Sequence, residues 1–285
     1  MVQKVMVEEE VVEQYQRDGV VLLKNVFDTS WVEKVARGIA KNLEDPSQYS
    51  EKITQGDGAY FNDYCNWTKI DEFRDYVYNS PAASLAASFM KTSRVSFYHE
   101  HVLNKEPGTT KCTPWHQDQP YYPIDGDKVC SLWMPVDPVP RDTCVSFIPG
   151  SHLWSKWFIP RKFATERNYQ LLKVPQEGEK TIKEVKSEGR SYYEVPEEDI
   201  ESGKWPRLQW QCEPGDVIVF HMRTLHGAAG NTSPTTHRRV LSTRWLGEDA
   251  VIAGRPWQVS PPVTGDLQPG QPAVCAAFPL VYTRP

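Results

Sequence analysis

One short polar stretch contains side chains that could bind a transition metal. Pro114-Trp115-His116-Gln117-Asp118 holds a His-x-Asp motif. Residues i and i+2 of an extended strand point to the same face, so we expect His116 and Asp118 to project together and Gln117 to point the other way. A third ligand, His226, follows the apolar run Asp216–Phe220. Two histidines and one carboxylate form the facial triad of non-haem Fe(II) oxygenases, which leaves positions on the metal open for small molecules.

A simpler interpretation of the motif is a hydrogen-bonded His-Asp pair, which is common in proteins. Two further features favour a metal site. His226 stands at the end of a predicted strand, and an arginine-rich strand, Arg238–Leu246, follows soon after it. We therefore expect His116, Asp118 and His226 to be both the metal ligands and the catalytic centre.

Composition bounds the class of protein. The chain has 285 residues, of which 39% are hydrophobic and 24% charged, and its net charge is −5. These values fit a single globular domain over residues 1–285, and the negative charge argues against a nucleic-acid partner. No basic-then-apolar leader and no long apolar run is visible, so we expect a cytoplasmic protein without a membrane partner. The oligomeric state is left open.

The cysteines give no sign of a zinc site, because none of the six occurs in a C-x-x-C pair. A chain of this length does not need disulfide staples, and we expect reduced thiols. The six are Cys65, Cys112, Cys130, Cys144, Cys212 and Cys275.

The first part of the chain, 1–92, is predicted to be a mostly helical flank. Apolar residues at helical spacing predict an amphipathic helix over Trp31–Asn42, and Ser30-Trp31-Val32-Glu33 has the form of a capping box. Glu44–Tyr60 is polar and rich in glycine, which indicates a loop. Further helices are expected over Glu8–Asp18, Ile70–Asn79 and Ala82–Lys91, with a strand over Gly19–Leu23.

From Arg94 onward the pattern changes to short strands separated by Gly and Pro turns, which favours a sandwich or barrel. We assign the core of this fold to residues 93–153 and 208–250. Its strands are expected at Val95–Leu103, Lys128–Met134, Thr143–Ile148, Asp216–Phe220 and Arg238–Leu246. Residues 154–207 interrupt the rhythm with a charged, aromatic-rich insertion, which is either a lid over the site or a solvated surface segment.

Several motifs, in this order, resemble the phytanoyl-CoA dioxygenase family of Fe(II)- and 2-oxoglutarate-dependent oxygenases. The resemblance implies a mainly β fold with flanking helices, a double-stranded β-helix or cupin-like jelly roll. It also implies 2-oxoglutarate and O2 as co-substrates alongside Fe(II). The motifs are Leu103-Asn104-Lys105-Glu106-Pro107-Gly108, Trp115-His116-Gln117-Asp118-Gln119-Pro120-Tyr121-Tyr122, Ile148-Pro149-Gly150-Ser151-His152, Pro214–His221, His226-Gly227 and Arg238-Arg239-Val240-Leu241-Ser242.

The far carboxylate of 2-oxoglutarate requires a cation, and the guanidinium fork suits it. The resemblance favours Arg238, with Arg244 second and Arg239 third. It also places Trp133, His101 and Ser242 beside the co-substrate. Many members carry a hydroxyl where this chain has Ala228, so one hydrogen bond to the co-substrate is missing. The remaining histidines are interpreted as structural: His99, His152, His221 and His237.

The implied reaction is oxidation of a C–H bond in a small-molecule substrate, with 2-oxoglutarate converted to succinate and CO2. Related halogenases lack the carboxylate ligand, so Asp118 favours hydroxylation or another oxidative outcome such as desaturation. The alternatives are an acyl-CoA 2-hydroxylase, an oxygenase that does not use 2-oxoglutarate and a non-enzymatic β-sandwich binding module. Candidate substrate-pocket residues are Tyr60, Asn62, Trp67, Gln119, Tyr121, Tyr122, Trp154 and Trp245.

Overall fold

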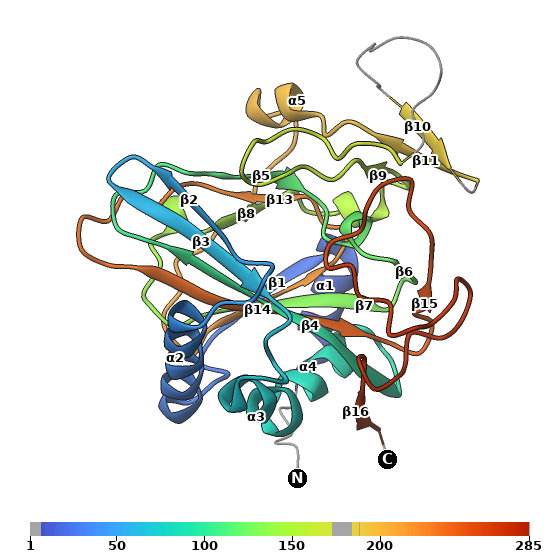
Figure 1. Cartoon of the computed structure of the whole chain (residues 1–285), viewed down its shortest axis with the longest axis horizontal. Coiled ribbons are helices and arrows are strands. Elements are labelled where there is room, and N and C mark those ends of the chain that lie inside the picture. Colours follow the sequence, from blue (N-terminus) through green and yellow to red (C-terminus); the bar gives the residue numbers. More distant parts are fainter. Residues whose placement is uncertain (1–6, 173–183, 188, 285) are drawn as a thin grey trace.

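The computed structural model describes residues 7–172, 184–187 and 189–284. Half of its strands belong to one large antiparallel sheet, shown in Figure 1. In spatial order the sheet contains β1 (Val20–Leu23), β12 (Val217–His221), β7 (Val129–Pro135), β14 (Arg238–Leu246), β4 (Arg94–Lys105), β3 (Gly58–Tyr64) and β2 (Glu51–Gln55), and β16 (Leu280–Thr283) also pairs with β4. Four of the five strands predicted after Arg94 are therefore in this sheet, with ends shifted by at most two residues, and the fifth, predicted at Thr143–Ile148, belongs to a smaller sheet.

A smaller sheet packs against the inner face of the large one. It consists of β5 (Thr113–His116), β13 (His226–Ala228) and β8 (Val145–Phe147). The two sheets share an apolar cluster, in which Val145 and Phe147 meet Trp133, Phe220 and Val240. This pair of facing antiparallel sheets is the distorted jelly roll that the sequence predicts.

Helices cover the outer face of the large sheet, which is the lower side in Figure 1. They are α1 (Glu9–Asp18), α2 (Thr29–Glu44), α3 (Asp71–Asn79) and α4 (Ala82–Phe89). In α2 the buried residues Val35, Gly38, Ile39 and Asn42 recur at helical spacing and form its packing face. Strand periodicity then divides the large sheet: alternate residues pack on these helices, and the others face the small sheet.

Two predictions for the N-terminal part were wrong. The N-cap of α2 is Asp28, whose carboxylate accepts from the Trp31 amide, so no capping box begins at Ser30. The expected loop over Glu44–Tyr60 contains strand β2, the hairpin turn and the first three residues of β3. Strand β2 is polar because it is an exposed edge strand, and the Gly56–Gly58 turn, where Gly56 has a φ of 78°, was read as a loop signal. The flank is thus helical but also supplies three strands.

The insertion at 154–207 forms a small layer above the small sheet in Figure 1. Its described elements are β9 (Trp157–Phe158), β10 (Glu184–Ser187), β11 (Arg190–Tyr193) and α5 (Glu197–Glu201). The part of the predicted insertion at 173–183 and 188 lies outside the described residues. The C-terminal segment follows β15 (Val251–Ile252), which pairs with β6 (Ile124–Asp125). Single-turn 3-10 helices lie at Gln119–Tyr121, Arg141–Thr143 and Ser151–Leu153.

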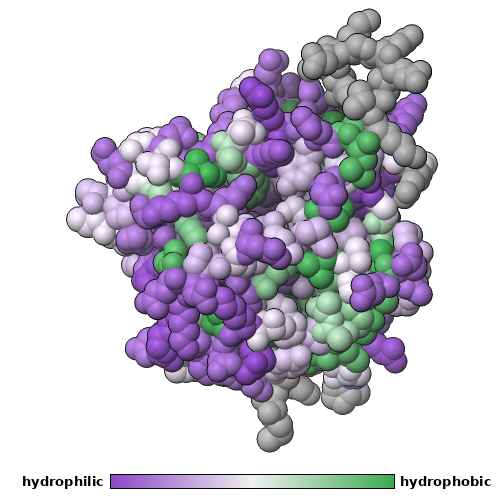
Figure 2. Space-filling model, in the orientation of Figure 1, coloured by the Kyte–Doolittle hydropathy of each residue, from purple (hydrophilic) through white to green (hydrophobic). Residues whose placement is uncertain are grey.

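Hydrophilic residues cover most of the face shown in Figure 2, and hydrophobic residues form separate groups on it. Among the residues that the structure describes, no helix combines the length and the apolar character needed to cross a bilayer.

A glycine inside α2 provides a test of helix docking. A Cβ at Gly38 would lie 2.5 Å from Cε1 of the buried Phe73 ring on α3. Gly→Ala within a helix normally stabilises a protein by about 1 kcal/mol. Here we expect Gly38→Ala to lower the free energy of unfolding by about 1 kcal/mol, because the overpacking cost exceeds that gain. Urea denaturation followed by circular dichroism measures this, and a stabilised variant would contradict the packing described.

Candidate functional site

Three side chains that could share a metal ion converge between the two sheets. The ligand atoms of His116, Asp118 and His226 all lie within 4.8 Å of one another, and all three residues are buried. Asp118 Oδ1 lies 3.5 Å from His116 Nε2 and 3.7 Å from His226 Nε2. His116 at the end of β5 pairs directly with His226 at the start of β13, so the sheet register itself sets the two imidazoles side by side.

Both imidazoles are oriented by the backbone. His116 Nδ1 lies 2.8 Å from the Pro114 carbonyl, and His226 Nδ1 lies 2.9 Å from the Thr224 carbonyl. A carbonyl only accepts, so each Nδ1 carries the proton and each Nε2 presents a lone pair to Asp118. Burial lowers the pKa of His226 to about 3, which keeps this ring neutral and able to bind a metal.

Asp118 joins the cluster by a different route from the one predicted. Strand β5 ends at His116, and Asp118 has helical dihedrals and begins a 3-10 turn. The side chains of His116 and Asp118 therefore do lie together, but the turn after β5 brings them together and not the alternation of a strand, as was predicted. Gln117 does point away, since its side chain bonds to the backbone of Lys156, Phe158 and Arg223.

The second carboxylate oxygen of Asp118 is held by the large sheet. Ser131 Oγ donates to Asp118 Oδ2 at 2.7 Å, and Arg244 Nε lies 3.2 Å from the same atom. Burial alone would raise the pKa of Asp118, but the adjacent Arg244 guanidinium opposes this, and that pKa lies well below its usual range. Asp118 is thus an oriented carboxylate with Oδ1 left for a ligand.

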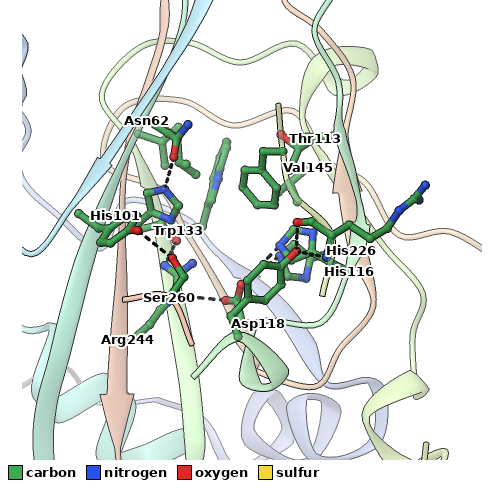
Figure 3. A pocket seen from close by; sticks show the side chains of 18 of the residues that line it. Asn62, His101, Thr113, His116, Asp118, Trp133, Val145, His226, Arg244 and Ser260 are labelled. Atoms are coloured by element: carbon green, nitrogen blue, oxygen red, sulfur yellow. Dashed lines mark hydrogen bonds and ion pairs between the residues drawn. The ribbon is translucent and has the colours of Figure 1, made fainter. Parts of the chain in front are cut away.

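A cavity of about 230 Å³ opens beside this cluster. Figure 3 shows Asn62, His101 and Trp133 facing the three candidate ligands across it. Ser242 on β14 pairs with His101 on one side and with Trp133 on the other, so these three residues form one row across the sheet. The register thus brings together the residues that the family resemblance placed beside the co-substrate.

The three arginines of β14 have different surroundings. Arg238 and Arg244 are buried and line the cavity, whereas Arg239 faces outward and forms a bidentate pair with Asp137. Arg244 bonds to Tyr122, to Ser242 and to Asp118. Arg238 donates only to the carbonyls of Thr143 and Ala229, and no carboxylate pairs with it among the residues described.

The outer part of the cavity is aromatic and includes residues that sequence reasoning missed. Phe163 of the insertion lies with its ring centroid 5.1 Å from that of His116 and is stacked near His101 at 6.4 Å. Tyr64 of β3 shares a 2.7 Å hydrogen bond with Ser260 of the C-terminal segment. Other lining residues not predicted are Tyr49, Glu51, His99, Arg161, Lys162, Tyr169 and Pro261. Clustered aromatics in the insertion were a usable signal, but nothing marked Ser260 or Pro261.

Four of the predicted pocket residues line the cavity: Tyr60, Asn62, Tyr121 and Tyr122. The other four do not. Trp67 and Trp245 pack in the helix-covered core, where both contact Phe97. Gln119 donates to the Ile124 and Gly126 carbonyls, and Trp154 packs on Trp205. These four residues were chosen because polar and aromatic side chains often line pockets. In the structure, however, their side chains point into the core or away from the site.

The histidines interpreted as structural are mostly so. His152 bonds to the Gln16 carbonyl, His221 to the Asp127 carbonyl and His237 to the Asn104 side chain. His99 is the exception, because it lines the cavity beside Tyr122. Burial lowers the pKa of His99 to about 3, so this ring adds no charge to the cavity.

Comparison with known proteins agrees with this geometry. The family model for phytanoyl-CoA dioxygenase (PhyH) matches residues 15–240. A probable phytanoyl-CoA dioxygenase of Caenorhabditis elegans is 25% identical over 66% of the chain, and the match spans about half (51%) of that relative. The ectoine dioxygenase of Stutzerimonas stutzeri (strain A1501) is 22% identical over 81% of this chain and 74% of its own.

Solved structures show the same fold. The non-haem α-ketoglutarate-dependent carbocyclase SnoK from nogalamycin biosynthesis superposes with a TM-score of 0.72 and 24% identity, covering 96% of each chain. EctD from S. alaskensis with 2-oxoglutarate and 5-hydroxyectoine gives a TM-score of 0.66 and 15% identity over 98% of this chain and 88% of its own. The family model covers most of the sequence, so the chain belongs to the phytanoyl-CoA dioxygenase family of non-haem iron, 2-oxoglutarate-dependent dioxygenases.

Proposed function

We propose that this protein oxidises a C–H bond of a small-molecule metabolite, by hydroxylation or a related outcome, while 2-oxoglutarate is converted to succinate and CO2. One observation carries the proposal. A cluster of two histidines and one carboxylate shares a single cavity with a buried arginine that has no carboxylate partner among the described residues. The first suits a divalent iron ion, and the second suits the far end of a dicarboxylate.

The residues fit an iron ion. His116 Nε2, His226 Nε2 and Asp118 Oδ1 would hold it, since the opposite atoms of all three side chains are occupied by the backbone, Ser131 or Arg244. Bound there with 2-oxoglutarate and O2, iron would supply the oxidising power that breaks a C–H bond. The protein's part is to fix the ligands, to position the substrate and to exclude water.

Arg238 is the proposed anchor for the far carboxylate of 2-oxoglutarate. It lies at the opposite end of the inner β14 row from Arg244, which is already engaged by Asp118. Burial lowers the pKa of Arg238, which reports an unfavourable environment for its charge. A carboxylate placed against this guanidinium would relieve that cost, because a buried charge is stabilised mainly by a paired, hydrogen-bonded partner.

Tyr60 is better assigned to the co-substrate than to the substrate. Its side chain is buried, and apart from the nearby Thr113 side chain its hydroxyl has no hydrogen-bond partner among the described residues. Tyr60 and Arg238 both pair with Lys105, one from β3 and the other from β14, so they lie in one row of the sheet. We propose that the Tyr60 hydroxyl donates to the same carboxylate as Arg238 and replaces the hydroxyl that is missing at Ala228.

The aromatic residues at the outer part of the cavity, which include Tyr64 and Phe163, form the proposed substrate site, and the insertion is its proposed lid. Tyr121 binds the insertion through two hydrogen bonds. Its hydroxyl donates to the Arg161 carbonyl at 2.6 Å and accepts from the Arg161 amide at 2.9 Å. Lys111, which is buried just before β5, pairs with Glu166 at 2.6 Å. These contacts hold Phe163 over His116. The small, aromatic cavity favours a compact substrate over an acyl-CoA.

Other aspects of the function stay predictions. A small-molecule substrate is the partner expected from the family. We further propose a cytoplasmic location and no nucleic-acid partner.

Removing the carboxylate ligand tests the metal centre. Asp118→Ala should weaken Mn(II) binding at least about 100-fold, because it removes a ligand rather than an outer partner. Ser131→Ala, which removes only the hydrogen bond to Asp118, should weaken it about 10-fold. Electron paramagnetic resonance of free Mn(II) measures both. Asp137→Ala is the control, since this aspartate pairs with Arg239 outside the cavity, and equal losses in all three variants would contradict the assignment.

Neighbouring arginines test the co-substrate site. Arg238→Ala should weaken binding of 2-oxoglutarate at least about thirtyfold, which corresponds to about 2 kcal/mol or more. Arg239→Ala should have little effect, because that side chain pairs with Asp137 on the other face. Isothermal titration calorimetry on Mn(II)-loaded protein gives both constants. Unchanged binding in Arg238→Ala would contradict Arg238 as the anchor and favour Arg244, whereas no binding in the wild type would favour an oxygenase that does not use 2-oxoglutarate.

The lid assignment predicts a change in coupling. Phe163→Ala should increase the succinate that is formed without substrate, because water would reach the site past His116. The matched control is Leu172→Ala, since Leu172 belongs to the same insertion but is 64% exposed and lies outside the cavity. Succinate release under air measures the effect, and an identical rate in both variants would contradict the role of Phe163.

A further inference from the structure

Two cysteines far apart in the sequence meet beside the proposed co-substrate site. Cys144 Sγ lies 3.9 Å from Cys212 Sγ, and both residues are fully buried. Cys144 follows the 3-10 turn at Arg141–Thr143, while the backbone of Cys212 bonds to Val139. The two sulfur atoms belong to the apolar cluster that contains Trp133 and Val240.

The position of Cys144 connects it to the proposed anchor. The preceding carbonyl, that of Thr143, accepts from Arg238 Nη1. The following residue, Val145, lines the cavity and pairs with Ala228 on the strand that begins with His226. A movement of Cys144 would therefore displace an acceptor of Arg238 and a wall of the cavity together.

The two thiols also differ in pKa, so one can attack an oxidant while the other acts as the resolving thiol. The two thiols share a contact in which either sulfur could donate, and this contact and the nearby Arg238 charge lower the pKa of the Cys144 thiol, while the pKa of Cys212 is raised. Cys144 is thus the better nucleophile and Cys212 the resolving partner. A disulfide needs its sulfur atoms about 2.05 Å apart, so closing the pair requires a shift of about 2 Å.

We propose that Cys144 and Cys212 form a reversible disulfide in response to hydrogen peroxide, and that this bond weakens the binding of 2-oxoglutarate. The second half rests on the proposed function of Arg238. The Cys144 thiolate attacks one peroxide oxygen, the O–O bond breaks, and the hydroxide that leaves takes up a proton as water. The Cys212 sulfur then attacks the sulfenic acid, the S–O bond breaks, and a second water is released. Two thiols are oxidised as one peroxide is reduced.

Ordinary core packing is the simpler explanation, because buried cysteines often act as small apolar residues. Packing alone predicts no preference for this pair during oxidation. Cys130 is a suitable comparison, because it is also fully buried and has no cysteine partner among the residues described. Disulfides in reducing compartments are usually transient and redox-sensing, which is the behaviour proposed here.

The first experiment maps the bond itself. Metal-free full-length protein is treated with hydrogen peroxide, free thiols are alkylated under denaturing conditions, and peptides are analysed by mass spectrometry. We expect a Cys144–Cys212 linked peptide that disappears with dithiothreitol, and no linked peptide in Cys212→Ser. Oxidation confined to other cysteines, or no linked peptide before the protein unfolds, would overturn the proposal.

The second experiment measures its consequence. Binding of 2-oxoglutarate to Mn(II)-loaded protein is compared before and after oxidation by calorimetry. Oxidised wild type should bind at least about tenfold more weakly, a change of about 1.4 kcal/mol. Cys212→Ser should bind equally before and after peroxide, whereas Cys130→Ser should keep the wild-type response. A mapped disulfide with unchanged affinity would overturn the coupling. If reduced wild type does not bind 2-oxoglutarate, the proposed function fails, and the mapping still decides whether the disulfide forms.

Discussion

The site depends on two guanidinium groups that one strand places inside the protein. Alternation along β14 sends Arg238 and Arg244 to the inner face of the large sheet, where both are buried. A buried charge costs several kcal/mol unless it is paired and hydrogen-bonded. Arg244 is paired with Asp118, which orients a metal ligand. Among the described residues, Arg238 donates only to backbone carbonyls, so its positive charge has no carboxylate partner. An incoming carboxylate would supply that partner.

The rest of the architecture keeps these charges in register with the three candidate metal ligands. His116 and His226 are neighbours because β5 and β13 pair, and Ser242, His101 and Trp133 form one row because β4, β14 and β7 pair. Helices cover the outer face of the same sheet, and Arg161, Lys162 and Phe163 of the insertion line the cavity. The cysteine pair lies at the start of β8, where the small sheet meets the neighbourhood of Arg238.

Periodicity made much of this predictable. The strands after Arg94 and the helices of the flank follow apolar patterns that their burial explains, and the three metal-ligand candidates stand out by residue type. The hairpin of β2 and β3 was missed because an exposed edge strand has no apolar pattern. Trp67 and Trp245 were misplaced because a tryptophan signals burial without showing which side of a sheet it faces. Ser260 and Pro261 reach the cavity through tertiary contacts that no local pattern encodes.

The most direct test of the central claim is an anaerobic titration of the metal-free protein with Fe(II) and then 2-oxoglutarate, followed by visible absorption. Iron and 2-oxoglutarate bound at one centre give a weak metal-to-ligand charge-transfer band. We expect this band in the wild type, its loss in Asp118→Ala, and a higher 2-oxoglutarate requirement in Arg238→Ala. Iron binding without the band would contradict the co-substrate assignment, and no iron binding at all would contradict the metal centre.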